Sequence, residues 1–542
     1  MVTDYMWIVV AGWIACFVMA FGIGANDVAN QFASSIGSKA VSLKTAIILS
    51  AILEFVGAAF LGGQVADTVR KRIVDFDVFM DNPELLMFGM LCALIGAGVW
   101  LMVASYLGWP ISTTHSIIGA IIGFSLATGD PSAVHWDQVG MIIASWIFSP
   151  ILSGIAASIL FFIIREAVLR PKDSVKRGFW NNGVLNGVAC LMYDKKLKEN
   201  VMKEPCKIKT WAATNPGLAV GITLAMAVGA ALICTPFLMW WVKKALAKYD
   251  ADVIKSQKDA EVNQVKEVEE GCSSREGNNN DSSSPGSVTP AQTGLQKDEI
   301  VAVVEEAGEG PSKQKKGLWA CLPFNQDLHK EALHESKEAA RIHENTENFD
   351  GRSERFFAIC QVLSACFDCV GHGSNDTANA VGPLAAIIGV YSAGAAVAKV
   401  ETPLYVLAFG GAAIAIGLAL YGHRVIKAIG VKMVKITPSR GFCIELGAAW
   451  IIIIGSNLGI PLSTTHCQVG ATVGVGLTEA DNESGRMCTW KRSGVNWKLL
   501  LNVFVAWILT LVFAGAVTAL IFSFGAYAPY LARGSLPVPT AA

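Results

Sequence analysis

The chain has 542 residues, of which 53% are hydrophobic and only 16% are charged, whereas soluble domains usually carry about 25% charged residues. Charge is concentrated between Lys243 and Arg355, where 113 residues hold 38 of the 87 charged residues, and the rest of the chain is strongly apolar. This pattern excludes an ordinary soluble protein and predicts a polytopic membrane protein. The formal net charge of −1 gives no basic excess that would suggest nucleic acid as a partner. The 13 cysteines are scattered, mostly singly in apolar runs, so we expect neither a disulfide framework nor a zinc site.

Apolar runs long enough, or nearly long enough, to span a membrane follow one another along most of the chain. They lie near residues 6–24, 45–66, 85–107, 139–164, 216–242, 381–400, 403–421, 442–458 and 499–524. Four further segments are shorter or more weakly apolar, at 116–128, 178–193, 356–370 and 468–477. We therefore expect an all-α membrane protein with about 10–12 transmembrane helices, some of them re-entrant or broken.

A hydrophilic segment divides the chain into two apolar halves. The predicted divisions are a first membrane half at 1–242, a central loop at 243–355, a second membrane half at 356–530 and a tail at 531–542. The loop has too little apolar surface to fold alone, so we expect it to be mostly disordered and to serve as a linker or a regulatory segment. Ala332 to Ile342 has the pattern of one short surface helix. Basic residues at 165–177 favour a cytoplasmic position for that segment, but the side on which the central loop lies stays open.

A polar motif that fits poorly into a membrane span occurs twice. The stretch GANDVAN at residues 24–30 returns as GSNDTAN at 373–379, with five of seven positions identical. A charged side chain at the centre of a span costs about 2.5–3.5 kcal/mol on insertion scales, so we expect both Asp residues to be used. Carboxylate and carboxamide oxygens suit Na⁺, and the flanking glycines would let the helix unwind. The predicted cation-binding residues are Asn26, Asp27, Asn30, Asn375, Asp376 and Asn379, with Na⁺ at Asp27 and Asp376.

A second motif follows each copy of the first. The stretch GWPISTTH at 108–115 returns as GIPLSTTH at 459–466, and the two motifs begin 84 and 86 residues apart in the two halves. Gly-x-Pro ends a helix or turn, and Ser-Thr-Thr starts a helix whose N–H groups, dipole and hydroxyls can bind an anion. Either motif alone could be a loop or a cap with a structural His, but matched duplication predicts a transporter binding site. The predicted anion-binding residues are Ser112, Thr113, Thr114, Ser463, Thr464 and Thr465; His115 and His466 either orient the site or carry a proton.

Lone polar residues within apolar runs are further candidates. Glu54 and Glu445 are isolated intramembrane carboxylates, and such groups are usually functional. Asp368 and His372 precede the second Asn-Asp motif without counterparts in the first half, and Asn457 follows four Ile residues. We expect the two glutamates to be important for transport and leave the roles of the other three residues open.

These motifs resemble the inorganic phosphate transporter (PiT) family of sodium-coupled phosphate symporters. The resemblance rests on residues 24–30, 373–383, 110–115 with Gly119, 461–466 with Gly470, and 436–446, and on two apolar halves around a long hydrophilic loop. It implies inverted-topology halves, about twelve spans and a cytoplasmic central loop. It also implies that the two Asp residues help to bind Na⁺, that the six Ser and Thr residues hold phosphate, and that both glutamates matter for transport.

Two positions depart from the family pattern. Gln31 follows the first Asn-Asp motif where the family usually has a small residue, whereas the second half keeps Ala380. Met90 stands where animal members carry a further intramembrane Glu, so the role of that glutamate is not transferred to this chain.

We predict a cation-coupled symporter, with Na⁺ as the expected cation, that imports inorganic phosphate across a plasma membrane and has neither enzymatic activity nor a cofactor. Moving one charge against the membrane potential costs about 2.3 kcal/mol per 100 mV, so monovalent phosphate gains from the voltage only with at least two cations. Three alternatives stay open: H⁺ as the coupling ion, sulfate or another oxyanion as substrate, and a phosphate sensor that no longer transports. A membrane hydrolase using Asp and His is disfavoured because the polar sets are duplicated. A homodimer is also left open.

Overall fold

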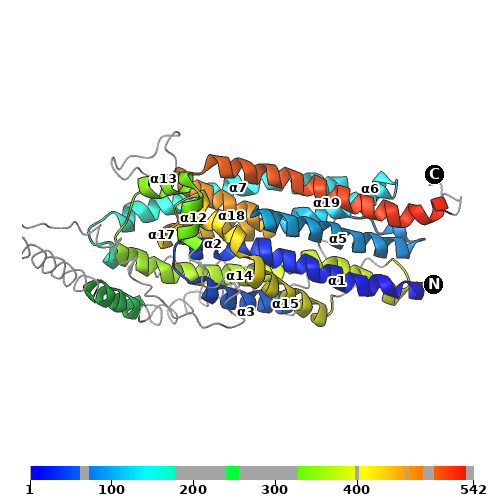
Figure 1. Ribbon diagram of the computed structural model, residues 1–542, viewed down its shortest axis with the longest axis horizontal. Coiled ribbons are helices and arrows are strands. Elements are labelled where there is room, and N and C mark those ends of the chain that lie inside the picture. Colours follow the sequence, from blue (N-terminus) through cyan, green and yellow to red (C-terminus); the bar gives the residue numbers. More distant parts are fainter. Residues whose placement is uncertain are drawn as a thin grey trace, which may run out of the picture.

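Figure 1 shows the computed structural model, in which long helices run roughly along one common axis. The structure describes residues 2–61, 73–177, 240, 242–255, 328–396, 402–457, 462–479 and 494–532. Among these residues there is no strand, and Val74 and Val134 form an isolated antiparallel bridge. The apolar run at 216–242 lies almost entirely outside the described residues, and the weakly apolar segment at 178–193 lies wholly outside them.

The helices agree with most of the predicted apolar runs. In the first half they are α1 (Met6–Ile23), α2 (Ala29–Gly37), α3 (Leu43–Leu61), α5 (Pro83–Leu107), α6 (Thr113–Ala127) and α7 (Trp136–Ile164). In the second half they are α14 (Gly351–Ala393), α15 (Leu404–Tyr421), α16 (His423–Lys427), α17 (Pro438–Asn457), α18 (Thr464–Leu477) and α19 (Trp497–Ala532). Six of the described helical segments are long and apolar enough to cross a membrane. The all-α membrane architecture is therefore confirmed.

The helices stay intact at both Asn-Asp motifs, so the predicted unwinding there is wrong. The first motif widens into a π-helical turn, η2 (Gly24–Val28), between α1 and α2. The second motif lies inside α14, which joins the segments predicted separately at 356–370 and 381–400 into one helix of 43 residues. A helix keeps its backbone N–H and C=O groups paired in apolar surroundings, and a π-helical turn often marks a functional position.

Each short Ser-Thr-Thr helix packs against a long helix from the other half of the chain. α6 contacts α19, and α18 contacts α7. The contacts are close because glycines lie against the backbone of the facing helix: a Cβ added at Gly119 would lie 2.6 Å from the carbonyl oxygen of Leu511, and one at Gly470 would lie 2.2 Å from that of Pro150. The two halves are thus interlocked around the helices that carry the second motif.

One end of the bundle carries the basic residues and the C-terminal part of the central loop. Arg170 pairs with Glu347 at 2.9 Å, and Ser353 donates to Ser174 at 2.7 Å. The basic segment at 165–177 and the start of α14 therefore lie at the same end of the bundle, whereas the side of the membrane on which this end lies stays a prediction.

A surface strap lies at this same end. It consists of α12 (Leu328–Glu335) and α13 (Lys337–Asn345), which Figure 1 places at the end of the bundle away from both termini. The prediction of a single helix from Ala332 to Ile342 is wrong, because Ser336 ends one helix and caps the next by accepting from the backbone N–H of Ala339. The strap contacts η8 (Ala428–Met433), where Lys432 pairs with Glu335 at 2.6 Å. Residues 242–255, at the start of the predicted loop, are helical as well. Whether the remaining residues of the central loop are disordered stays a prediction.

Candidate functional site

The two Ser-Thr-Thr motifs start their helices in the same way. Ser112 is the N-cap of α6, and Ser463 is the N-cap of α18, with nearly equal φ and ψ of −87° and 124° against −88° and 121°. Each hydroxyl accepts a hydrogen bond of 3.3 Å from the backbone N–H of the following His. The predicted helix starts are therefore confirmed, and each leaves N–H groups at the positive end of a helix dipole.

Asn26 fixes the turn that precedes the first of these helices. Its amide nitrogen donates to the carbonyl oxygen of Trp109 at 2.9 Å and to Ser105 Oγ at 3.3 Å, while its amide oxygen accepts from the N–H of Ile111 at 2.9 Å. α5 ends just before, at Gly108, whose φ of +68° favours glycine. The first Asn-Asp motif thus positions the second motif, which the sequence did not predict.

Asp27 joins the two Ser-Thr-Thr helices. Its buried carboxylate accepts from Thr113 Oγ1 at 2.6 Å on one oxygen and from Thr465 Oγ1 on the other. Thr113 begins α6 in the first half, and Thr465 is the second residue of α18 in the second half. One carboxylate therefore contacts the starts of both helices.

Asp376 occupies the corresponding position on α14. One carboxylate oxygen accepts from Thr464 Oγ1 at 3.0 Å, and the other lies 3.4 Å and 3.3 Å from the amide nitrogens of Asn375 and Asn379. The same Asn379 amide lies 3.2 Å from the hydroxyl oxygens of Thr113 and of its neighbour Thr114. Side chains of the two Asn-Asp motifs and of both Ser-Thr-Thr motifs thus form one connected network.

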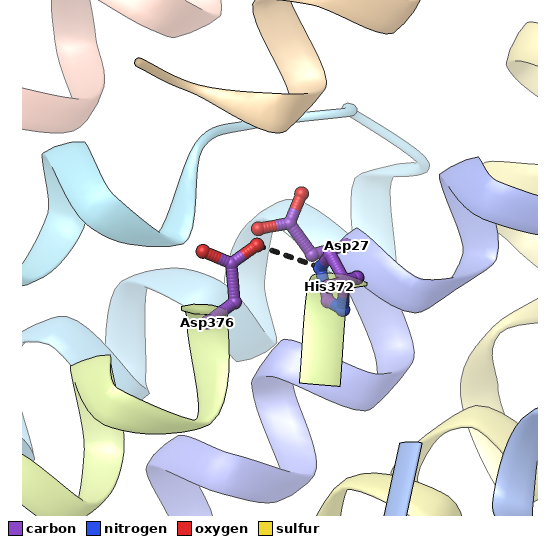
Figure 2. Close-up of side chains that lie close together, drawn as sticks. All are labelled: Asp27, His372 and Asp376. Atoms are coloured by element: carbon purple, nitrogen blue, oxygen red, sulfur yellow. Dashed lines mark ion pairs between the residues drawn. The ribbon is translucent and has the colours of Figure 1, made fainter. Parts of the chain in front are cut away.

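Figure 2 shows Asp27 and Asp376 approaching each other beside His372, and the dashed line marks the ion pair between His372 Nε2 and Asp376 at 2.7 Å. One ligand atom from each residue lies within 4.8 Å of the others, so the cluster could hold a metal ion. Carboxylate and hydroxyl oxygens suit a hard cation such as Na⁺, whereas the imidazole nitrogen does not. Two carboxylates this close repel each other unless a cation or a proton lies nearby.

Comparison with known proteins places this arrangement in a family. Residues 23–518 match the model of the phosphate transporter family. The chain belongs to the phosphate transporter family. A relative named sodium-dependent phosphate transporter from Plasmodium falciparum is 34% identical over 97% of this chain and 98% of its own, and one from Toxoplasma gondii is 30% identical with the same coverage. A solved structure titled "The sodium-dependent phosphate transporter" matches with a TM-score of 0.64 and 27% identity, covering 95% of this chain and 98% of its own.

Membership of the phosphate transporter family confirms the resemblance inferred from the motifs. Together with the apolar helices, it makes this chain an integral membrane protein. Of the two departures from the family pattern, Gln31 is buried, and its amide oxygen has no hydrogen-bond partner among the described residues. Met90 is buried in the hydrophobic core on α5.

Glu54 and Glu445 are both buried, and each contacts the opposite half of the chain. Glu54 Oε1 on α3 lies 3.0 Å from His372 Nδ1, and the other ring nitrogen of His372 contacts Asp376. His372 therefore links Glu54 to Asp376. Glu445 on α17 accepts from four side chains. These are Ser34, Ser35 at 2.9 Å, Gln361 at 3.4 Å and Ser364.

Sequence reasoning missed the four partners of Glu445, because polar residues between 81 and 411 positions away in the chain give no local signal. His372, whose role the sequence leaves open, is the side chain that connects Glu54 with Asp376. Asp368 is buried on α14, four residues before His372. The side chains of Asn30 and Asn457 lie outside the described residues.

His115 and His466 face each other between the two helix starts, with ring centroids 4.5 Å apart. Two tryptophans that sequence reasoning also missed, Trp146 and Trp507, pack on their outer faces at 3.7 Å and 3.6 Å. A signal for them exists in the sequence, because α7 and α19 each begin with Trp and carry a second Trp ten residues later.

Proposed function

We propose that this chain is a symporter that couples the import of inorganic phosphate to Na⁺. One observation carries the proposal: the threonines that begin the two helices are hydrogen-bonded to the carboxylates of Asp27 and Asp376. A phosphate ion at the helix starts would meet two negative charges, so its binding requires cations that neutralise them. The relatives named sodium-dependent phosphate transporters support both the substrate and the cation.

The hydroxyl protons divide the site into a cation part and an anion part. A hydroxyl has one proton to donate, and those of Thr113, Thr464 and Thr465 point to carboxylates. Their lone pairs remain for a cation. Ser112 accepts from a backbone N–H group and keeps its own proton for phosphate, together with the N–H groups of the helix starts. Ser463 also accepts from a backbone N–H group, and its proton is kept for phosphate when His466 Nδ1 is the donor in the contact between these two side chains.

The transport cycle that we propose is alternating access between two inverted-topology halves. Its support is the matched cap geometry at the starts of α6 and α18 and the reciprocal packing of α6 on α19 and α18 on α7. Import of a monovalent phosphate is favoured by an inside-negative potential only when at least two cations accompany it. The carboxylates of Asp27 and Asp376 supply two negative charges that can bind these two cations.

We further propose that the central loop is cytoplasmic in a plasma membrane. The end of the bundle that holds the strap also holds the basic residues of the segments at 165–177 and 424–440, and basic residues favour the cytoplasmic side.

A proton-coupled symporter is a second candidate, because His372 contacts both Glu54 and Asp376 and is a base within the carboxylate cluster. The test is uptake of radiolabelled phosphate by cells that lack their own uptake, with Na⁺ replaced by choline at two pH values. Sodium coupling predicts loss of uptake in choline at both pH values. Uptake in choline that rises at the lower pH would instead support H⁺, and competition by excess sulfate would show that the substrate class is wider than phosphate.

A further inference from the structure

Four aromatic rings contact one another in a continuous row, the aromatic stack, between the two helix starts of the site. Trp146 and His115 are tilted by 43°, His115 and His466 meet edge to face at 70°, and His466 and Trp507 are stacked at 25°. The order is Trp146, His115, His466 and Trp507, with centroid distances of 3.7 Å, 4.5 Å and 3.6 Å along the stack. Both imidazoles are only 1% exposed. Each ring comes from a different helix, namely α7, α6, α18 and α19 in that order.

The stack is tied directly to the residues that cap the two helices. Each His is the third residue of its helix, and its backbone N–H donates to the N-cap serine. In addition, His466 Nδ1 lies 2.9 Å from Ser463 Oγ. Trp507 Nε1 donates to the carbonyl oxygen of Pro110 at 3.0 Å, so a ring stacked on the second motif also holds the turn of the first.

The surroundings of the imidazoles favour positioning over proton transfer. Among the described residues, the partners of the two rings are indoles, each other and the Ser463 hydroxyl, and none is a carboxylate. Neither ring nitrogen of His115 has a hydrogen-bond partner in the described part of the chain. A proton relay needs a donor or an acceptor at each end, whereas packed aromatic rings fix a distance.

We propose that the stack of Trp146, His115, His466 and Trp507 sets the separation of the two helix starts and thereby positions the groups that bind phosphate. These four are positioning residues. The inference rests on the proposed phosphate transport, and it assigns to the two histidines the orienting role rather than the proton-carrying one. An anion held between two helix ends is sensitive to their spacing, because hydrogen bonds weaken steeply outside their preferred distances.

The transport test compares a substitution that keeps an aromatic ring in the stack with substitutions that remove one. His115→Ala should raise the phosphate KM about three- to tenfold, the range that one aromatic contact supplies. Trp507→Leu should raise it at least as much, because it also removes the hydrogen bond to Pro110. The Na⁺ concentration for half-maximal uptake at saturating phosphate should change less. His115→Phe keeps a ring and gives up no hydrogen bond of the described residues, so it should recover most of the KM and keep the wild-type pH profile. Trp136→Leu is the matched control, because Trp136 is an exposed residue of the same helix as Trp146, away from the stack.

Two results would overturn the positioning role. One is a His115→Phe variant as impaired as His115→Ala with an altered pH profile, which would indicate a proton carrier. The other is a wild-type KM in both His115→Ala and Trp507→Leu, with surface expression confirmed by biotinylation.

A measurement without transport separates this inference from the proposed function. In purified protein, the losses of thermal stability caused by His115→Ala and His466→Ala should be strongly non-additive, because the rings are in contact. Additive losses would contradict the stack. Absence of Na⁺-dependent phosphate uptake by the wild type would overturn the proposed function alone.

Discussion

Asn26→Ala tests whether the first Asn-Asp motif holds the turn before the phosphate site or acts only as a cation ligand. The substitution removes three hydrogen bonds, those to Trp109 O, Ser105 Oγ and Ile111 N. A neutral hydrogen bond contributes about 0.5–1.5 kcal/mol, so the expected loss is about 3 kcal/mol of unfolding free energy. Ser105→Ala removes only the longest of the three and should cost about 1 kcal/mol or less.

The assay is unfolding of the purified protein in detergent, first in choline and then in Na⁺ buffer. The turn-holding role predicts that Asn26→Ala is destabilised in both buffers and about three times as strongly as Ser105→Ala. The phosphate KM should rise as well, because the cap of α6 follows directly after this turn. A loss of stability that appears only in Na⁺ buffer would refute the reasoning and return Asn26 to a cation-binding role.

Three further predictions concern the anion site, the strap and the interlocked helices. Ser112→Ala and Ser463→Ala should each raise the phosphate KM about tenfold, as expected for a lost hydrogen bond to a charged ligand; an unchanged KM in both would argue against the helix-start anion site. Burial lowers the pKa of His343 in the strap from its ordinary 6.5 to about 4. Folding therefore favours its neutral form, so strap docking should be fully stable above pH 6.5 and weaken as the pH falls towards 4, measured by proteolysis of the strap and abolished as a pH effect in His343→Gln. Gly470→Ala should destabilise the protein by more than 1 kcal/mol, because its Cβ meets a backbone oxygen. The control Gly140→Ala, which faces open space, should be neutral or stabilising in the same thermal scan.

The local parts of the site could be predicted from the sequence because they depend on neighbouring residues. The helix starts at Ser112 and Ser463 depend on a short local pattern, in which an N-cap hydroxyl follows a turn that contains Pro. The apolar runs likewise give the long helices, since span length follows from bilayer thickness.

The contacts between the halves could not be predicted in this way. Asp27 contacts Thr465, and Glu445 contacts Ser34, because the two halves interlock, and nothing near either carboxylate indicates its distant partner. The duplication predicted one shared binding site, but not which side chains of the two halves contact each other there.

The unwinding expected at the Asn-Asp motifs was wrong for a different reason. The Asn and Asp side chains of the two motifs suggested a break in the helix. These side chains find their hydrogen-bond partners on other helices, so the backbone at both motifs can stay helical. At Ser336 the sequence does contain a local signal for a break, because a serine is a favourable N-cap. The helical pattern on both sides of Ser336 nevertheless suggested one continuous helix.

The central claim is that cations at Asp27 and Asp376 permit phosphate to bind, and the most direct test is the phosphate Kd of the purified protein with and without Na⁺. The account predicts that Na⁺ tightens phosphate binding, that phosphate tightens Na⁺ binding by the same factor, and that Asp376→Asn reduces this coupling. Phosphate that binds the wild type equally well in Na⁺ and in choline would contradict it.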